Sequence, residues 1–470
     1  MSNQNKDIHC LALDGGGIRG ILELIYLQEL ERKTKKRVHE LFHTVTGTST
    51  GGLISLLLTV PSKEGKVASA AEALEIYKSL ASRIFFTCRF FSLSFVTIYF
   101  FISLILSICL PFFVQLEKLF PYADLLHKVL ILTCIIAFGL MCKYFSKPVY
   151  SPKGLESFCE EYFGKKRTLK DAVTNVGVVA VNIEKERPFV FNSMRARLDP
   201  QCSLHNAEIA RIARSTSAAP SYFPPVSFNI NYKNHLCGTC SFMTPWWDPR
   251  PVSSKYDKKI MIFEDGGTKA NNPSALCLDL AKWKLTRDGY NPADFNIRLL
   301  SIGTGELNPI YKKEKKVKSI SWYNPAIPDG GLDHVLYRLL GNDVFNVTTN
   351  SQNVHVDMTL LYELTNKEED YQRVQFEISP DQLEYMDDIS EKNILSLVQT
   401  ANKTVEEHFD KTLKFIQRAV HSNKNSRKDI DTNDSEMNQP RQDEKEDSSK
   451  YQKSKKVSRK EETVSKRQVK

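Results

Sequence analysis

Short apolar runs along the chain end in glycine-rich turns, and helical patterns follow them. Ile8–Leu13 predicts a buried strand, and Ile21–Lys33 behind it has the apolar spacing of a helix. Phe42–Thr46 predicts a second short strand, with an apolar helix from Gly51 onward. A further apolar strand is predicted at Ile260–Phe263, again directly before glycines. The glycine-rich turns after these strands are therefore the first places to look for chemistry.

A much longer apolar stretch lies between Arg89 and Glu117, which enclose 27 uncharged residues, among them FSLSFVTIYFFISLILSICL at Phe91–Leu110. That length is enough for a membrane-spanning helix of roughly 20 residues. A second run, between Lys128 and Lys143, has 14 uncharged residues. It suits a re-entrant segment, or a span if its lysines extend to the interface. The segment between the two runs has apolar residues at near-helical intervals, which is typical of an interfacial helix.

The remaining composition is that of a globular protein of 470 residues, a quarter of them charged. Ten scattered cysteines are too few for a disulfide scaffold, so we expect reduced thiols in a cytosolic setting. The first residues, MSNQNKDIHC, lack the basic and apolar regions of a signal peptide, and we expect none.

The net charge of +9 is distributed unevenly along the chain. From Asn423 onward the sequence has almost no large apolar residues, which predicts a disordered tail. From Lys450 onward Lys and Arg dominate, a composition that can bind anionic lipid or nucleic acid or simply aid solubility.

Gly15, Gly16 and Gly17 form the turn after the first strand and open a helix. Backbone N–H groups at such a turn can point to one place, where the helix dipole adds positive potential. The turn therefore suits a bound phosphate or an oxyanion that forms during a reaction. The known phosphate loops fit poorly, because Gly-Lys-Ser/Thr and G-x-G-x-x-G are both missing here.

The second turn, Gly47-Thr48-Ser49-Thr50-Gly51, has the G-x-S-x-G pattern between a strand and a helix. This nucleophile elbow is too sharp for side chains at the flanking glycines, and it presents the serine hydroxyl at the head of the helix. Ser49 is thus the candidate nucleophile.

A serine nucleophile needs a base. Asp265, followed by Gly266 and Gly267 at the end of a strand, can project a carboxylate into the same crevice as Ser49. An aspartate in this role requires a partly desolvated site that raises its pKa. In an α/β-hydrolase the base would instead be a late histidine, for which the candidates are His334, His355 and His408.

Together, these three motifs in this order resemble the patatin-like phospholipases. Asp14-Gly15-Gly16-Gly17-Ile18-Arg19-Gly20 resembles the family's oxyanion loop, Gly47 to Gly51 its nucleophile elbow, and Asp265-Gly266-Gly267 its aspartate motif. Further stretches agree, namely ARSTSAAPSYFPP, NNPSAL and LLSIGTGE.

The resemblance implies a three-layer α/β/α sandwich with a central, mainly parallel sheet. We expect this domain to occupy residues 1–420, with a hydrophobic helical hairpin inserted at 88–146 and the disordered Lys/Arg-rich tail at 421–470.

The resemblance also implies a lipid acyl hydrolase with a Ser49–Asp265 dyad, in which Asp265 takes the serine proton. The N–H groups of Gly15, Gly16 and Gly17 would stabilise the oxyanion. Arg19 could contact a lipid phosphate or be a structural arginine. No metal and no other cofactor is implied.

One departure from the family is the long region from Asn229 to Lys259. Cys237 and Cys240 have the spacing of zinc ligands, but only His235 is nearby as a third, so no metal site is expected. The neighbouring Trp246-Trp247 pair can enter a bilayer interface or pack on the domain.

The other departure is the apolar insert at 88–146. Ser49 precedes it and Asp265 follows it, so the chain must leave and return on one face of the membrane, by two crossings or a re-entrant hairpin. Basic residues at both ends favour a catalytic domain facing the cytoplasm. The alternative is a helical hairpin that covers the acyl pocket.

We therefore expect a membrane-associated hydrolase whose substrate is membrane phospholipid. The hairpin would hold it to the bilayer, the basic tail could add contacts to anionic lipid, and no nucleic acid partner is expected. The alternatives are a non-catalytic membrane scaffold or lipid-binding protein, and a His-dependent α/β-hydrolase esterase.

Overall fold

A computed structural model describes residues 6–85, 150–220, 222–231, 258–307, 370–379 and 386–420, parts of 100–148, and positions 356, 360 and 382. One compact unit spans Ile8–Ile416, and the other consists of Met1–Asp7 and Gln417–Lys470. The basic tail, the Cys237 and Cys240 pair and the two tryptophans fall outside the described residues. The expectations for these segments stay predictions, as do the domain limits.

Ten strands and ten helices have bounds within the described residues. The strands are β1 (Lys6–Leu13), β2 (Thr44–Thr48), β3 (Asn175–Asn182), β4 (Arg187–Asn192), β5 (Val226–Asn231), β6 (Lys258–Asp265), β7 (Phe295–Ile302), β8 (Glu306–Leu307), β9 (Tyr371–Val374) and β10 (Glu377–Ile378). The helices are α1 (Gly20–Thr34), α2 (Val38–Leu41), α3 (Thr50–Thr59), α4 (Ala70–Ile84), α7 (Lys153–Phe163), α8 (Ser193–Leu198), α9 (Ile209–Thr216), α10 (Gly267–Ala270), α11 (Ser274–Arg287) and α16 (Glu391–Val420).

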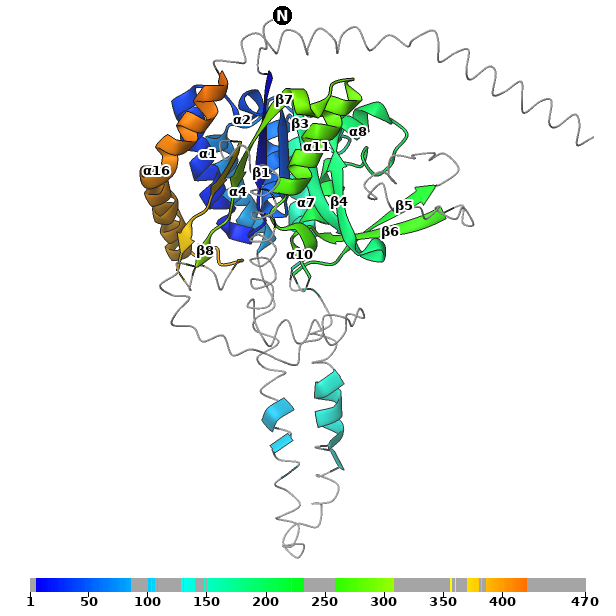
Figure 1. The fold of residues 1–470 in the computed structure, drawn as a ribbon. Helices are drawn as coiled ribbons and strands as arrows, with labels where there is room; N and C mark the ends of the chain where they lie inside the picture. Colours follow the sequence, from blue (N-terminus) through cyan, green and yellow to red (C-terminus); the bar gives the residue numbers. More distant parts are fainter. Residues whose placement is uncertain are drawn as a thin grey trace, which may run out of the picture. The chain divides into compact units, whose positions relative to one another are not determined.

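The main sheet has the strand order β5-β6-β3-β2-β1-β7-β9, and β4 pairs with β3 off this path (Figure 1). At its centre β2 is parallel to both β1 and β3, and farther along β7 is parallel to β9. β4 and β6 are antiparallel to β3. The prediction of an α/β sandwich with a largely parallel sheet is confirmed, with an antiparallel part beyond β3.

The antiparallel direction of β6 decides how Asp265 reaches the site. β6 overlaps β3 over only three pairs, the last of which is Asp265 with Ala180, while Val179 of β3 pairs with Thr48 of β2. The end of β6 thus arrives beside the end of β2 from the opposite direction. Asp265 was predicted to lie at the end of its strand, in the same crevice as Ser49, and this short antiparallel overlap is what puts it there.

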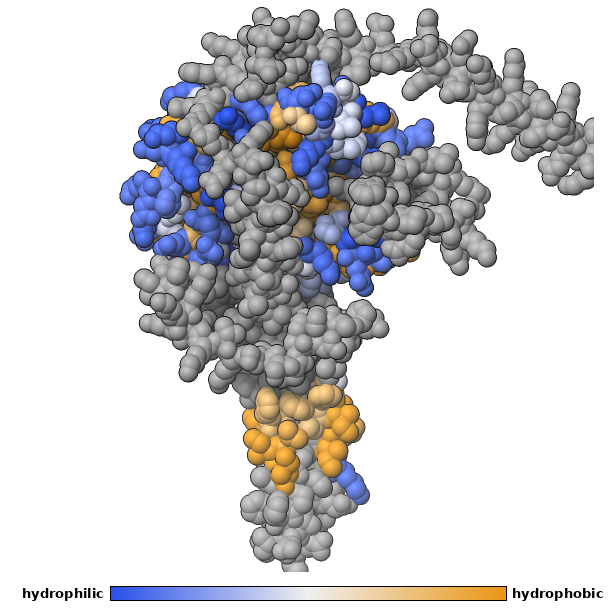
Figure 2. Space-filling model, viewed as in Figure 1, coloured by the Kyte–Doolittle hydropathy of each residue, from blue (hydrophilic) through white to orange (hydrophobic). Residues whose placement is uncertain are grey.

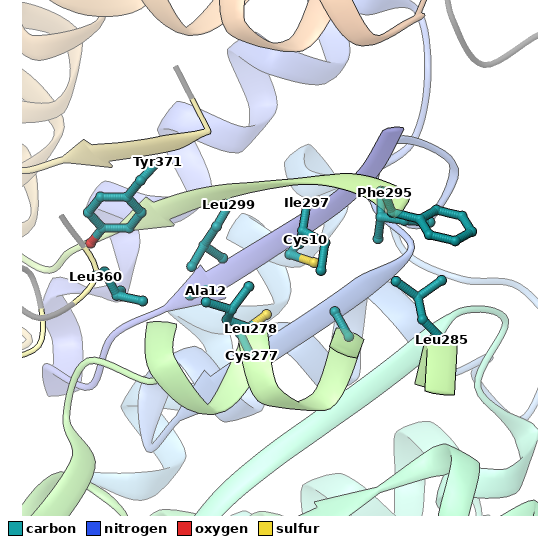
Figure 3. Close-up of a cluster of buried hydrophobic side chains, with 12 residues drawn as sticks. Cys10, Ala12, Cys277, Leu278, Leu285, Phe295, Ile297, Leu299, Leu360 and Tyr371 are labelled. Carbon is teal, nitrogen blue, oxygen red and sulfur yellow. The ribbon is translucent and has the colours of Figure 1, made fainter. Parts of the chain in front are cut away.

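The side chains of β1 alternate between the two faces of the sheet, as in any strand. Ile8, Cys10 and Ala12 belong to a buried cluster that includes Cys277 and Leu278 of α11, and Figure 3 shows the labelled members of this cluster between the sheet and that helix. The odd-numbered Leu11 and Leu13 are fully buried as well, and by alternation they face the other layer. Helices therefore cover β1 on both faces.

Within the insert, the described pieces are helical and belong to both apolar runs. The ring of Phe100 lies 5.9 Å from that of Phe138, so the two runs contact each other as the arms of a hairpin would. Their outer side chains are largely exposed and form an apolar surface in Figure 2. These residues, between 42% and 62% exposed, are Phe101, Ile102, Ile105, Ile108, Val129, Ile131, Leu132, Ile135, Ile136 and Phe138. In the described part of the chain, none of the helices has the length and apolar character needed to span a membrane.

Candidate active site

Ser49 sits between β2 and α3 with φ of 52° and ψ of −117°, a conformation that costs free energy in a residue with a side chain. The glycines on either side permit this turn. A Cβ on Gly47 would lie 2.0 Å from the carbonyl oxygen of Gly51, and one on Gly51 would lie 2.3 Å from that of Leu13. The local geometry is that of the predicted nucleophile elbow.

The carboxyl group of Asp265 lies against the serine hydroxyl. Ser49 Oγ donates to Asp265 Oδ2 at 2.7 Å, and the N–H of Gly267 donates to Oδ1 at 2.7 Å. The second bond fixes the orientation of the carboxyl group, and Asp265 is only 1% exposed. The structure thus brings together the two residues that the sequence singled out.

Burial raises the pKa of Asp265 from its ordinary value of 3.8 to about 7, against the opposing effects of the Ser49 and Gly267 hydrogen bonds. The neighbouring Glu264 adds a smaller upward contribution to this pKa. A carboxyl group with a pKa near neutrality can accept a proton from a hydroxyl far better than an exposed aspartate.

The glycine-rich loop places its N–H groups differently from the prediction. The N–H of Gly15 donates to the carbonyl oxygen of Asn271 at 3.2 Å, so it is engaged. Gly16 and Gly17 line the same pocket as Ser49, and their N–H groups bond to none of the described residues. The N–H groups of Gly16 and Gly17 can therefore bind a group in the pocket, whereas that of Gly15 is engaged within the protein.

Gly17 has φ of +58°, and a Cβ on it would lie 2.1 Å from the carbonyl oxygen of Met386. Its own carbonyl oxygen accepts from Thr50 Oγ1 at 2.8 Å and from Tyr77 Oη at 2.7 Å. Thr50, directly after Ser49, and a tyrosine of α4 thus hold the loop in place.

An ion pair largely shielded from solvent holds the start of the glycine-rich loop. Arg373 of β9 donates from Nη1 and Nη2 to the two carboxylate oxygens of Asp14, at 2.9 and 2.5 Å. Nη1 also donates to Ser301 Oγ, and the N–H of Asp14 donates to Glu23, whose pKa is raised by burial. Arg373 was missed in the sequence because its partner lies 359 positions away and nothing local marks it.

Arg19 is 4% exposed, and its Nε donates to the carbonyl oxygen of Gly16 at 3.2 Å. Burial lowers its pKa to about 10. The structure therefore places Arg19 as a support of the loop, and a contact to a lipid phosphate stays a prediction.

The other residues of the motifs hold neighbouring backbone. Thr48 Oγ1 donates to the carbonyl oxygen of Ala270, and the N–H of Ser49 donates to Thr216 Oγ1. Gly266 precedes α10, the short helix that begins at Gly267.

No described histidine lies beside Ser49 as the alternative base. His408 lies on α16 with 64% of its side chain exposed, beside Glu407, while His334 and His355 fall outside the described residues. Within the described ranges, His, Cys, Asp and Glu form no group of three that could hold a metal ion.

The pocket beside Ser49 and Asp265 is mainly apolar. It is lined by Leu53, Ile84, Phe85, Leu155, Phe223 and Met386, among others. Such a lining suits a hydrocarbon chain rather than a charged ligand.

Comparison with known proteins finds matches among patatin-like proteins, as the three motifs of the sequence led us to expect. The sequence model of the family described as patatin-like phospholipase matches residues 11–278. Patatin-like protein 1 of Arabidopsis thaliana is 24% identical over 86% of this chain and 84% of its own. Patatin group D-3 of Solanum tuberosum is also 24% identical, over 85% and 84%. The crystal structure of VipD from Legionella pneumophila covers 85% of this chain and 67% of its own, at 13% identity and a TM-score of 0.31, too low a score to bear on the fold.

The raised pKa of Asp265 predicts a stability effect. The folded protein holds this proton up to about pH 7, whereas the unfolded chain loses it near 3.8. Stability from this group is present below the unfolded pKa, and it falls by up to about 4 kcal/mol as the pH rises through about 7. Asp265→Asn should therefore flatten the pH dependence and be more stable than the wild type at pH 8. Unfolding midpoints in urea between pH 4 and 8 test this.

Asp294→Asn, which removes an exposed carboxyl group, is the matched control and should follow the wild type. Parallel curves for Asp265→Asn and the wild type would contradict the assigned pKa.

Proposed function

The chain belongs to the patatin-like phospholipase family, and from this premise we propose that it cleaves fatty acyl esters of membrane phospholipids, with Ser49 as nucleophile and Asp265 as its base. Family membership makes it a lipid acyl hydrolase. The observation that carries the finer assignment is the 2.7 Å hydrogen bond from Ser49 Oγ to a buried carboxyl group at the wall of an apolar pocket.

In the proposed reaction, the Asp265 carboxylate takes the proton of Ser49 as Oγ attacks the ester carbonyl carbon. Negative charge forms on the carbonyl oxygen, where the N–H groups of Gly16 and Gly17 stabilise it. The intermediate collapses, and the departing lysophospholipid oxygen takes the proton from Asp265. Water then attacks the acyl-enzyme with Asp265 again as base, which releases the fatty acid and restores Ser49.

We also propose that the hairpin enters the bilayer and holds the catalytic unit on its cytoplasmic side. Ten large apolar side chains are exposed on the described parts of the insert, far more than scattered surface residues would give. The contact between Phe100 and Phe138 supports a paired arrangement in which both arms enter together. The tail, with its Lys and Arg residues, adds contacts to anionic lipid in this proposal.

Ser49→Ala should lower fatty acid release from phosphatidylcholine vesicles by about 1,000-fold or more, because the covalent step is lost. The unfolding temperature should change little. Fatty acid release, measured by mass spectrometry, and labelling by a serine-directed fluorophosphonate are the readouts.

Ser82→Ala, on the exposed side of α4, is the control and should keep both activity and labelling. Undiminished release by Ser49→Ala would exclude the dyad, and a wild-type protein that neither hydrolyses lipid nor reacts with the probe would favour a non-catalytic scaffold.

The activity should depend on the ionisation of Asp265. Because the carboxylate must accept a proton, kcat/KM should rise as the pH increases and level off above about 7. Initial rates on a soluble ester such as p-nitrophenyl butyrate, from pH 5 to 9, measure this. A midpoint near pH 4 would contradict a buried base.

Replacing Leu132, Ile135 and Phe138 together by Gln should weaken binding to phosphatidylcholine vesicles by about 100-fold or more, since each buried side chain contributes roughly 1.5–3 kcal/mol. Co-sedimentation with vesicles is the measurement. The matched control replaces three apolar residues exposed outside the insert, Val173, Ile183 and Leu198, by Gln. Equal binding of both variants would overturn the bilayer proposal.

A further inference from the structure

The described residues on either side of the insert lie at the active-site pocket or beside it. α4 ends at Ile84, and Ile84 and Phe85 line the pocket at the point where the chain enters the insert. Where the chain returns, the ring of Tyr150 contacts that of Phe85 edge to face, with 5.4 Å between the centroids. Five residues later Leu155 lines the same pocket. The described chain segments before and after the insert therefore lie together, beside Ser49.

α4, the helix before the insert, bonds directly to the glycine-rich loop. Tyr77 lies on α4, two turns before Ile84, and is 3% exposed. Its Oη donates to the carbonyl oxygen of Gly17 at 2.7 Å, so the orientation of that carbonyl depends on the position of α4.

Tyr150, which follows the insert, is linked to the same loop through the segment that contains Met386 and Asp387. Tyr150 is 8% exposed, and its N–H donates to the carbonyl oxygen of Tyr222 at 2.8 Å. Tyr150 Oη donates to Asp387 Oδ2 at 2.5 Å. The preceding residue, Met386, accepts at its carbonyl oxygen from the N–H of Ile18 at 2.8 Å.

These contacts meet on a single peptide unit. The carbonyl group of Gly17 and the N–H of Ile18 belong to the same planar peptide bond. Tyr77 of α4 holds the carbonyl side of this peptide, and Tyr150 holds its N–H side through Asp387 and Met386. The N–H of Gly17 belongs to the peptide directly before it, so the way the Gly17–Ile18 peptide is held affects the direction of that N–H.

We propose that Tyr150 is a positioning residue that, through Asp387 and Met386, holds the Gly17–Ile18 peptide and thereby helps to set the geometry of the proposed oxyanion hole. This inference rests on the proposed hydrolase function. It assigns to Tyr150, which follows the insert in the chain, a role in the reaction that is separate from any contact the insert makes with lipid.

Tyr150→Phe removes the bond to Asp387 and keeps the aromatic contacts. On soluble p-nitrophenyl butyrate, kcat should fall about 10-fold, as expected for one lost hydrogen bond to a charged group, with KM within about twofold. Asp387→Ala should give a similar loss, and the double variant should lose little more than either single variant. Asp387→Asn, which still accepts the bond, should retain activity.

Tyr162→Phe, a half-buried tyrosine of α7 that stacks on Phe158, is the matched control and should leave kcat unchanged. A wild-type kcat in Tyr150→Phe, or fully additive losses with Asp387→Ala, would overturn the proposal.

Hydrogen exchange gives a readout that does not depend on activity. In peptides covering residues 14–24, the Ile18 amide should exchange about 10-fold faster in Tyr150→Phe and Asp387→Ala than in the wild type and Tyr162→Phe. Faster exchange in a protein without hydrolase activity would reject the proposed function and keep the link between Tyr150 and the loop. Unchanged exchange would reject that link even if Ser49→Ala confirms hydrolysis.

Discussion

The hydrogen bond between Ser49 and Asp265 joins residues 216 positions apart, and the rest of the domain is arranged around it. It requires a strained turn after β2, a strand that arrives from the opposite direction, and a buried carboxyl group whose pKa is raised to about 7. The strained turn and the buried carboxyl group each cost stability. The apolar side chains buried on both faces of β1 offset that cost.

The parts of the site that could be predicted are those whose conformation depends on residues adjacent in the chain. A serine between two glycines after a strand, three glycines before a helix, and an aspartate before two glycines are each determined by neighbours in the chain. From them the sequence located Ser49 and Asp265, which the structure brings together, and the α/β fold that holds them. The predicted strand at Phe42–Thr46 is observed two residues later, as β2.

The parts that escaped prediction depend on distant partners. Nothing near Gly15 shows that its N–H will meet the carbonyl group of Asn271, 256 positions on, and nothing near Arg373 shows that it will bind Asp14. The direction of β6 relative to its neighbours could not be predicted from its own residues either, because an apolar run of this length can pair in parallel or antiparallel fashion. The burial of Arg19 follows from packing that the motif itself does not encode.

The edge-to-face contact of Phe85 and Tyr150 has a consequence for how this protein can be rebuilt or can diversify. Two chain ends that touch can be closed by a short turn or joined to another module without opening the sheet between them. This position can therefore accept a different inserted segment while the sheet and the residues around Ser49 stay as they are.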